Sequence, residues 1–384
     1  MDNISSQSDT RRRWLKINGA TLIASALAGR AQQAEDVDSE PRMPSADHPV
    51  RMMYNENPVP ASPAIRSAMI DAFEESNSYS YFRAVGELKV ILAKLNGVTP
   101  EHIVVGAGST EVLRATALQL LKKLPVAQRR IAAVGPGYEG MNRYAQSLGT
   151  KVTRVPVLPD FSPDLDGLAK AVDEGASILN LCNPNNPTGV IVPEKILAPF
   201  CRRMAKKTFV FVDEAYHEFV TNPEYGSMLP LVKEGLPVMV TRTFSKMFGL
   251  AGTRIGYGIA SPELVAELEA IKTGTVNIIA IRAAMAALKD KEFHKRSLEN
   301  NEESKEIIVS ELKKMGRKVT KGEGNFVFFH TGMPIQEFQK TMLAKGFRVG
   351  RPFPPHLDWC RLSMSTPEHM SQFCAALRTV LSGK

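Results

Sequence analysis

The sequence predicts an α/β fold with a large, mostly parallel sheet, followed by a smaller α+β domain. Short β-branched runs alternate with helical patterns between residues 100 and 245, as expected for βαβ units. The segments "ASILNLCNPNNPTG", "TFVFVDEAY" and "PVMVTRTFSK" each end an apolar strand in polar residues. Because ligands of such folds bind beyond the carboxyl ends of the strands, we expect the functional site at these polar ends.

The pattern changes after about residue 276. Here "AIRAAMAALKD" and "NEESKEIIVSELKKM" predict amphipathic helices, and "NFVFFHT", "FRVGRPF" and "CRLSMS" predict short strands. We therefore predict a large domain over residues 61–275 and a small C-terminal domain over residues 276–384. Residues 29–60 are predicted to form an N-terminal arm.

Composition excludes several function classes. The 384 residues are 43% hydrophobic and 23% charged, an ordinary globular balance with room for two domains. No apolar run reaches the roughly 18–20 residues of a spanning helix, so no stable membrane anchor is expected. The net charge is +8, and the basic cluster over residues 313–321 lacks interleaved aromatics, which favours a solvated face over a nucleic-acid site. Neither CxxC nor zinc spacing occurs, so we predict no metal site and mostly core positions for Cys182, Cys201, Cys360 and Cys374.

The N-terminal stretch "TRRRWLKINGATLIASALAGRA" predicts an export signal. A basic segment precedes an uncharged stretch, and Ala26-Leu27-Ala28 is a plausible cleavage site. The segment resembles the twin-arginine (Tat) motif, with Trp14 where Phe is usual. A disordered basic tail is the weaker alternative. We therefore predict a Tat signal peptide over residues 1–28, the Tat translocase as a partner during export, and a periplasmic or secreted location.

Each candidate motif also has a purely structural interpretation. Residues 106–110 follow a strand and open a helix, which suits a phosphate site or a tight turn. Asp213 ends an apolar strand, where it could equally be a helix N-cap. Lys246 lies among hydroxyls and small residues, a setting for a nucleophilic amine or for a solvated lysine. Arg254 taken alone could form a surface ion pair, and residues 183–189 could form a turn.

Together, these signals match the requirements of one ligand. Pyridoxal 5′-phosphate needs a lysine for a Schiff base and a carboxylate against its pyridine nitrogen. From about Tyr54 to the C-terminus the motifs "NENP", "GAGSTE", "PGYE", "NPNNPTG", "DEAY", "TFSK", "LAGTRIGY", "NFV" and "RLSMSTPE" occur in order. The chain resembles the fold-type-I pyridoxal-phosphate aminotransferases of class I/II, and within them the histidinol-phosphate aminotransferase-like group.

The resemblance implies three catalytic residues. Lys246 forms the internal aldimine and moves the substrate proton, Asp213 keeps the pyridine nitrogen protonated, and Tyr216 binds the phenolic oxygen. The other cofactor-binding residues that it implies are Gly108, Ser109, Thr110, Thr243, Ser245 and Arg254, together with Asn186 on the phenolic oxygen, Tyr138 stacked on the ring, and Tyr79 at the phosphate of a neighbouring subunit's cofactor. Its implied substrate-binding residues are Asn57, Arg351 and Arg361. Of these, Arg361 binds an α-carboxylate through two parallel hydrogen bonds.

The implied reaction is a ping-pong transfer of an amino group from an amino acid to a 2-oxo acid, in a homodimer. Two departures from the group argue against histidinol phosphate as the substrate, as does export. Residues 274–277 read "GTVN" where a Pro-aromatic-Asn segment is usual, and only Asn277 persists. The loop before Arg351 is one residue longer, so this arginine either binds a distal acidic group or braces its loop.

Two other functions stay open at this point. The motifs specify a carbanion chemistry but not its outcome, so a lyase, decarboxylase, cyclase or oxidase acting on an exported amino-acid-like substrate is the first alternative. A non-catalytic binding protein is the second, although the presence of Lys246, Asp213 and Tyr216 argues against it.

Overall fold

The computed structural model describes residues 43–381, and the elements discussed below belong to the compact unit that begins at Ser45. The predicted signal peptide with its cleavage site, and residues 29–42 of the predicted arm, lie outside the described residues. Among the helices of residues 43–381, none is both long enough and apolar enough to cross a membrane.

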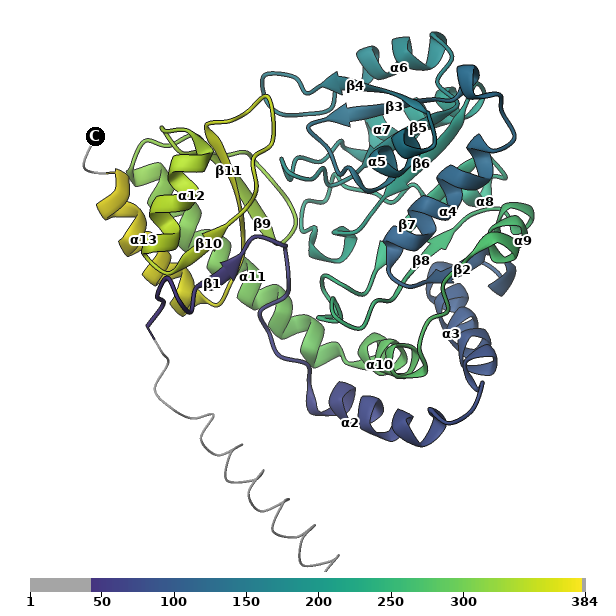
Figure 1. Cartoon of the computed structure of the whole chain (residues 1–384), viewed down its shortest axis with the longest axis horizontal. Helices are drawn as coiled ribbons and strands as arrows, with labels where there is room; N and C mark the ends of the chain where they lie inside the picture. The colour runs from purple at the N-terminus through teal and green to yellow at the C-terminus, as the bar shows by residue number, and fades with distance from the viewer. Residues whose placement is uncertain (1–42, 382–384) are drawn as a thin grey trace, which may run out of the picture. The chain divides into compact units, whose positions relative to one another are not determined.

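Within this range seven strands form the principal sheet, in the order β2-β8-β7-β6-β5-β3-β4 (Figure 1). The strands are β2 (Ile103–Gly106), β3 (Arg130–Gly135), β4 (Lys151–Pro156), β5 (Ile178–Cys182), β6 (Phe209–Asp213), β7 (Val238–Thr243) and β8 (Gly256–Ile259). Pairing is parallel from β4 through β7, whereas β8 is antiparallel to both β7 and β2. No helix lies between β7 and β8, so the chain lacks the crossover that a parallel β8 needs. The predicted mostly parallel α/β sheet is thus confirmed.

Helices cover both faces of this sheet. Phe211 of β6 packs on one face, and Val210 and Val212 pack on the other, as the alternation of a strand requires. Helices α4 (Ser109–Leu121), α5 (Gly140–Ser147) and α9 (Pro262–Ile271) cover the Phe211 face. The opposite core includes side chains of α2 (Pro63–Asp71), α3 (Tyr81–Asn96), α6 (Leu165–Asp173), α7 (Glu194–Ala205), α8 (Leu229–Lys233) and α10 (Ile278–Lys289).

A second apolar core lies in the C-terminal part of the chain (Figure 1). Its strands are β9 (Phe326–His330), β10 (Phe347–Val349) and β11 (Trp359–Ser363), and its helices are α11 (Lys291–Lys314), α12 (Ile335–Ala344) and α13 (Pro367–Leu381). Strand β11 runs antiparallel to β9. The core of the large sheet also includes α10 and Phe293, which lie beyond the predicted boundary at residue 275.

The arm connects the two cores. Its strand β1 (Val50–Met52) pairs in parallel with β10, and Met52 is buried in the second core. The chain then reaches α2, which packs on α10 beside the large sheet. Residues 53–56 therefore pass from one core to the other, and this passage brings them over the functional site.

Candidate functional site

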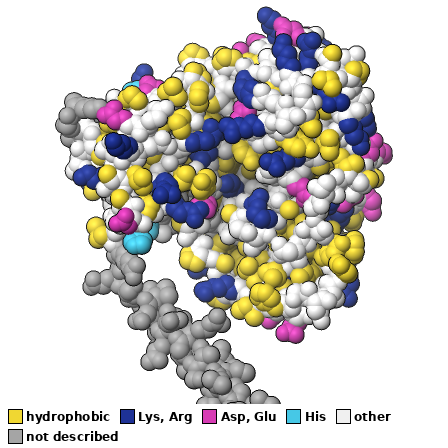
Figure 2. Space-filling model, viewed as in Figure 1, with side chains coloured by type: hydrophobic (Ala, Val, Ile, Leu, Met, Phe, Trp, Pro, Cys, Tyr) yellow, Lys and Arg dark blue, Asp and Glu magenta, His cyan; other side chains and the backbone are white. Residues whose placement is uncertain are grey.

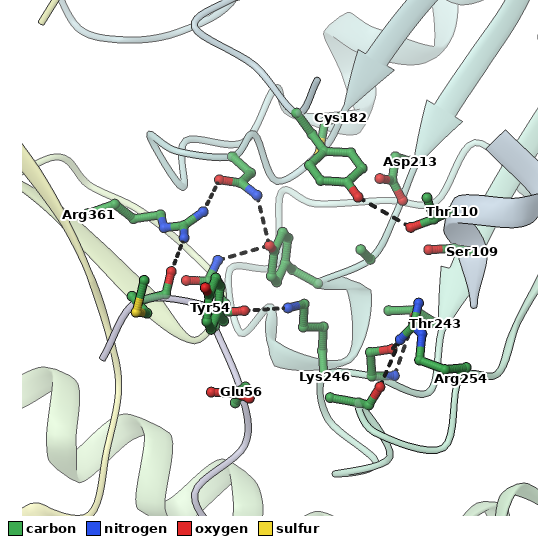
Figure 3. A pocket seen from close by; sticks show the side chains of 18 of the residues that line it. Tyr54, Glu56, Ser109, Thr110, Cys182, Asp213, Thr243, Lys246, Arg254 and Arg361 are labelled. Atoms are coloured by element: carbon green, nitrogen blue, oxygen red, sulfur yellow. Dashed lines mark hydrogen bonds between the residues drawn. The ribbon is translucent and has the colours of Figure 1, made fainter. Parts of the chain in front are cut away.

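A cavity lies where β5, β6 and β7 end, at the edge of the sheet that the sequence predicts (Figure 3). It is lined by twelve of the predicted site residues, namely Ser109, Thr110, Tyr138, Asn186, Asp213, Tyr216, Thr243, Ser245, Lys246, Arg254, Arg351 and Arg361. Residues without a predicted role complete the lining, namely Met53, Tyr54, Asn55, Glu56, Cys182, Ala215 and Ala251. All four cysteines are free and buried, and Cys182 lies at the floor of this site beside Asp213.

Asp213 and Lys246 meet because their strands are parallel neighbours. Asp213 is only 4% exposed, and Thr241 donates a hydrogen bond to its Oδ1 at 3.0 Å. Burial raises the pKa of Asp213 to about 6, although the Thr241 hydrogen bond opposes the rise. Lys246 Nζ donates to the carbonyl oxygen of Tyr54 at 2.8 Å. Burial, together with the charge of Arg361, lowers the pKa of Lys246 to about 7, so its amine loses a proton near neutral pH.

The Tyr216 hydroxyl accepts two amide hydrogen bonds. Asn186 Nδ2 donates to its oxygen at 3.1 Å, and Asn55 Nδ2 donates at 2.9 Å. Burial raises the pKa of Tyr216, so the hydroxyl keeps its proton. Since both lone pairs are occupied, that proton is free to be donated into the cavity. An oxygen acceptor bound there, such as a phenolate, fits this arrangement.

The predicted phosphate cup forms at the start of α4. Gly108 has φ +81°, and a Cβ atom there would clash with the Arg254 guanidinium. A Cβ on Gly256 would clash with the backbone nitrogen of Ser109. Arg254 Nη1 donates to Ser245 Oγ at 3.3 Å. A helix N-terminus, hydroxyls and a guanidinium around close-packed glycines suit a phosphate group.

Two arginines lie on the C-terminal side of the cavity. Arg361 of β11 donates from Nη1 to Asn186 Oδ1 at 2.7 Å and from Nη2 to the carbonyl of Met53. Its Nε is buried without a hydrogen-bond partner among the described residues. The guanidinium groups of Arg361 and Arg351 lie 5.1 Å and 4.2 Å from the ring centroid of Phe353. Arg351 also donates to the carbonyl of Pro352 at 3.0 Å, so it braces its loop while it lines the cavity.

Three predicted residues lie outside the cavity lining. Gly108 forms the backbone of the phosphate cup just behind it. Asn57 points away, because its amide donates to the carbonyl of Met247 at 2.8 Å and to Ser297 Oγ at 2.9 Å. Asn55, two residues earlier, faces the cavity instead. Tyr79 is 86% exposed, and its contact with a neighbouring subunit stays a prediction.

Thr241 and Asn55 are not among the site residues that the sequence predicts. Thr241 precedes the "TFSK" motif by two residues in β7, so the alternation of the strand could have identified it. Asn55 belongs to the quoted "NENP" motif, but its orientation depends on a left-handed backbone (φ +54°) that spacing does not reveal.

The aminotransferase class I and II family model matches residues 48–377, which include the whole of this cavity. The chain belongs to this family.

Relatives of this aminotransferase include curated histidinol-phosphate aminotransferases. The protein from Halalkalibacterium halodurans is 33% identical over 87% of this chain and 89% of its own length. That from Akkermansia muciniphila is 34% identical over 86% and 90%. The crystal structure of histidinol-phosphate aminotransferase from Sinorhizobium meliloti, in complex with pyridoxal-5′-phosphate, has a TM-score of 0.80 and 26% identity, covering 88% of this chain and 91% of that one.

The chain is therefore a pyridoxal-phosphate-dependent aminotransferase of fold type I. Its residues fit the cofactor: the cup at Gly108 and Arg254 suits the phosphate, and the buried Asp213 carboxylate suits a protonated ring nitrogen. When bound, the cofactor supplies a ring that withdraws electrons from the substrate carbon. Among residues 43–381 no cluster of His, Cys, Asp and Glu is arranged to hold a metal ion.

The chemistry of the chain's own groups follows from these positions. With the cofactor bound, Lys246 Nζ would attach it and would take up and return the substrate proton, because the lowered pKa of Lys246 leaves a neutral amine available near neutral pH. Asp213 would hold its negative charge against the ring nitrogen of the bound cofactor, and Tyr216 would donate its proton toward the phenolic oxygen. The carbonyl of Tyr54 keeps the amine turned into the cavity while it is free.

We expect Asp213→Asn to lower kcat/KM by about 10²–10⁴-fold, because the amide cannot hold a proton on the ring nitrogen by its charge. Thr241→Val, which leaves the carboxylate but removes one hydrogen bond to it, should cost about tenfold or less. Steady-state kinetics of both variants with the same donor and acceptor measure the difference. An Asp213→Asn enzyme as active as Thr241→Val would contradict this role.

Proposed function

We propose that this aminotransferase takes its amino group from an amino acid and passes it to a 2-oxo acid, in two half-reactions at one site. The observation that supports the substrate class is the buried Arg361, whose Nε lacks a partner at the wall of the cavity. A guanidinium binds a carboxylate through two parallel hydrogen bonds. Arg351 provides a second cation in the same cavity, which suits donors and acceptors with a distal acid group. Figure 2 shows further Lys and Arg side chains across the middle of one face.

Histidinol phosphate is the second candidate donor. Relatives about one-third identical are histidinol-phosphate aminotransferases, and a phosphate also suits the two arginines. The unusual segment 274–277 does not line the cavity. Asn277 caps α10 by accepting from the amide nitrogen of Ala280 at 2.8 Å, and Gly274 donates to Glu111. The departure at residues 274–277 therefore makes no contact in the cavity that would favour an amino acid over histidinol phosphate as the donor, or the reverse.

The deciding experiment uses residues 29–384 loaded with the cofactor and one donor at a time, without acceptor. Conversion of the visible absorption to that of the amino form, reversed by a 2-oxo acid, supports transamination and identifies the donor. Glutamate, aspartate, alanine and histidinol phosphate form the first set. Return of the original spectrum without an acceptor, together with a new product, would instead indicate a lyase, decarboxylase or oxidase.

Arg361→Lys should raise KM for a carboxylate donor by about 10–100-fold, the scale of hydrogen bonds to a charged group. A lysine keeps the positive charge but loses the fork. Arg351→Lys serves as the matched variant: it should raise KM for donors with a distal acid and leave alanine almost unaffected. Equal effects of Arg361→Lys on a carboxylate donor and on an amine without an acid group would contradict the assignment.

A homodimer is also part of the proposal. Exposed apolar side chains gather on α2, on the 3₁₀ turn at Ala72–Glu75 and on α3, with Ile70, Phe73 and Phe82 exposed by 65%, 59% and 70%. Tyr79 lies in the same stretch. Clusters of this kind mark protein contact surfaces, so we place a second copy of the chain there. The family resemblance then implies that Tyr79 contacts the phosphate site of the partner.

Mixing two defective chains tests the shared site. Lys246→Ala abolishes activity, and Tyr79→Ala should weaken cofactor retention by about 10–100-fold. In a hybrid dimer one site carries both defects and the other carries neither. We expect co-expressed, doubly tagged hybrids to recover about half of the wild-type activity per dimer at limiting cofactor. Hybrids no more active than the Tyr79→Ala homodimer would show that the sites are not shared.

Export by the Tat route stays a proposal, supported by the order of basic, uncharged and small residues over residues 10–31. Because this route carries folded proteins, it suits an enzyme that acquires its cofactor inside the cell. We expect Arg11→Lys/Arg12→Lys, which keeps the charge, to leave the precursor in the cytoplasm. Cell fractionation with activity assays measures this, and mature enzyme still present in the periplasm would refute the route.

A further inference from the structure

Asn55 makes an unusual number of hydrogen bonds for one arm residue. It is 1% exposed and has φ +54°, a conformation that costs energy for any residue other than glycine. Its backbone nitrogen donates to Ser363 Oγ at 2.7 Å, and its carbonyl accepts from Asn325 at 3.0 Å. Its side chain accepts from Ser363 Oγ at 2.9 Å and donates to Tyr216 Oη at 2.9 Å. The backbone groups of Asn55 thus bind Ser363 and Asn325, whereas its side-chain amide donates to Tyr216.

Two chains of hydrogen bonds meet at Tyr216 Oη, and both begin on β11. In the first chain Arg361 donates to Asn186, which donates to Tyr216 (Figure 3 shows Arg361 at its outer end). In the second chain Ser363 donates to Asn55, which donates to Tyr216. Arg361 and Ser363 are two positions apart on the strand and share one face.

We propose that Asn55 is a positioning residue for the transamination: its amide aims the Tyr216 proton at the phenolic oxygen of the cofactor and strengthens that donor. With Asn186 alone, one lone pair of Oη would be free and the hydroxyl could rotate. A second amide fills that lone pair, which leaves the proton one direction, and a donor that itself accepts hydrogen bonds is polarised into a stronger one. The inference rests on cofactor binding at Lys246.

Other groups around Tyr216 also act on its hydroxyl. Burial raises its pKa, Arg361 lowers it, and Cys182 and Asp213 raise it. Lys246 Nζ lies 5.9 Å from the centroid of the Tyr216 ring. These charges act on Tyr216 independently of the Asn55 amide. A neutral substitution at Asn55 therefore removes the amide and leaves the charges in place.

The test is a pH titration of the visible absorption of the holoenzyme. Asn55→Gly removes the amide, introduces no charge and tolerates the positive φ. Because the Tyr216 hydroxyl stabilises the cofactor form with an ionised phenolic oxygen, a weaker donor makes that form appear only at higher pH. We expect the midpoint to rise by about 0.5–1 pH unit, the scale of one hydrogen bond to a charged group.

A double-mutant cycle separates positioning from general disturbance. Tyr216→Phe should raise the midpoint further, and adding Asn55→Gly to it should change nothing more, because the donor is already gone. Asn300→Ala is the matched control: it removes an amide bound to the carbonyl of Ser365 outside the cavity and should leave the midpoint unchanged. Thermal unfolding of each variant checks that it is folded.

Ser363→Ala provides the second variant if Asn55→Gly does not fold. It releases the Asn55 side chain without altering Asn55 or Tyr216, and its smaller upward shift must also vanish in Tyr216→Phe. An unchanged midpoint in the folded variant, or a shift of the same size on the Tyr216→Phe background, would overturn the proposal. A wild-type protein that shows no visible absorption band of a cofactor attached to Lys246 would instead refute cofactor binding, which is a separate failure.

Discussion

The site depends on the burial of one carboxylate. Asp213 lies at the end of a central parallel strand with 4% of its surface exposed, where water stabilises its charge poorly. A buried carboxylate either takes up a proton or pairs with a positive group. The raised pKa of Asp213 reflects the first response. A protonated pyridine nitrogen of the bound cofactor would supply the second. Thr241 keeps one carboxylate oxygen occupied, so the interaction has a fixed direction before the cofactor arrives.

The arm makes this edge of the sheet into a closed site. Residues 53–56 lie between the two cores and contact the groups that matter most: the carbonyl of Met53 accepts from Arg361, the carbonyl of Tyr54 accepts from Lys246, and Asn55 donates to Tyr216. A movement of the C-terminal domain on the large one therefore cannot leave these contacts unchanged. Hydrogen bonds through Asn186 and Asn55 connect Arg361 and Ser363 of β11 to the Tyr216 hydroxyl.

The C-terminal domain contributes two positive charges, Arg351 and Arg361, which pack against an aromatic ring. Phe353 is buried, and its ring lies near the guanidinium groups of both Arg351 and Arg361. Phe161, from the loop after β4, packs on Trp359 with a centroid distance of 4.4 Å and so joins the large domain to the same cluster. The longer loop at Arg351 thus has a structural anchor of its own. Like charges close together favour an acid-bearing ligand between them.

Much of this protein is determined locally by the sequence. Alternating strands and helices specify the parallel sheet, and the polar ends of the strands specify the edge at which Asp213, Lys246 and Asn186 meet, because parallel strands end together. The phosphate cup follows from glycines and hydroxyls at the start of a helix. By contrast, only the tertiary structure decided that α10 packs in the core of the large sheet and that Asn55 rather than Asn57 faces the cavity. These features depend on the left-handed backbone at Asn55 and on packing between segments hundreds of residues apart, which residue spacing along the chain does not encode.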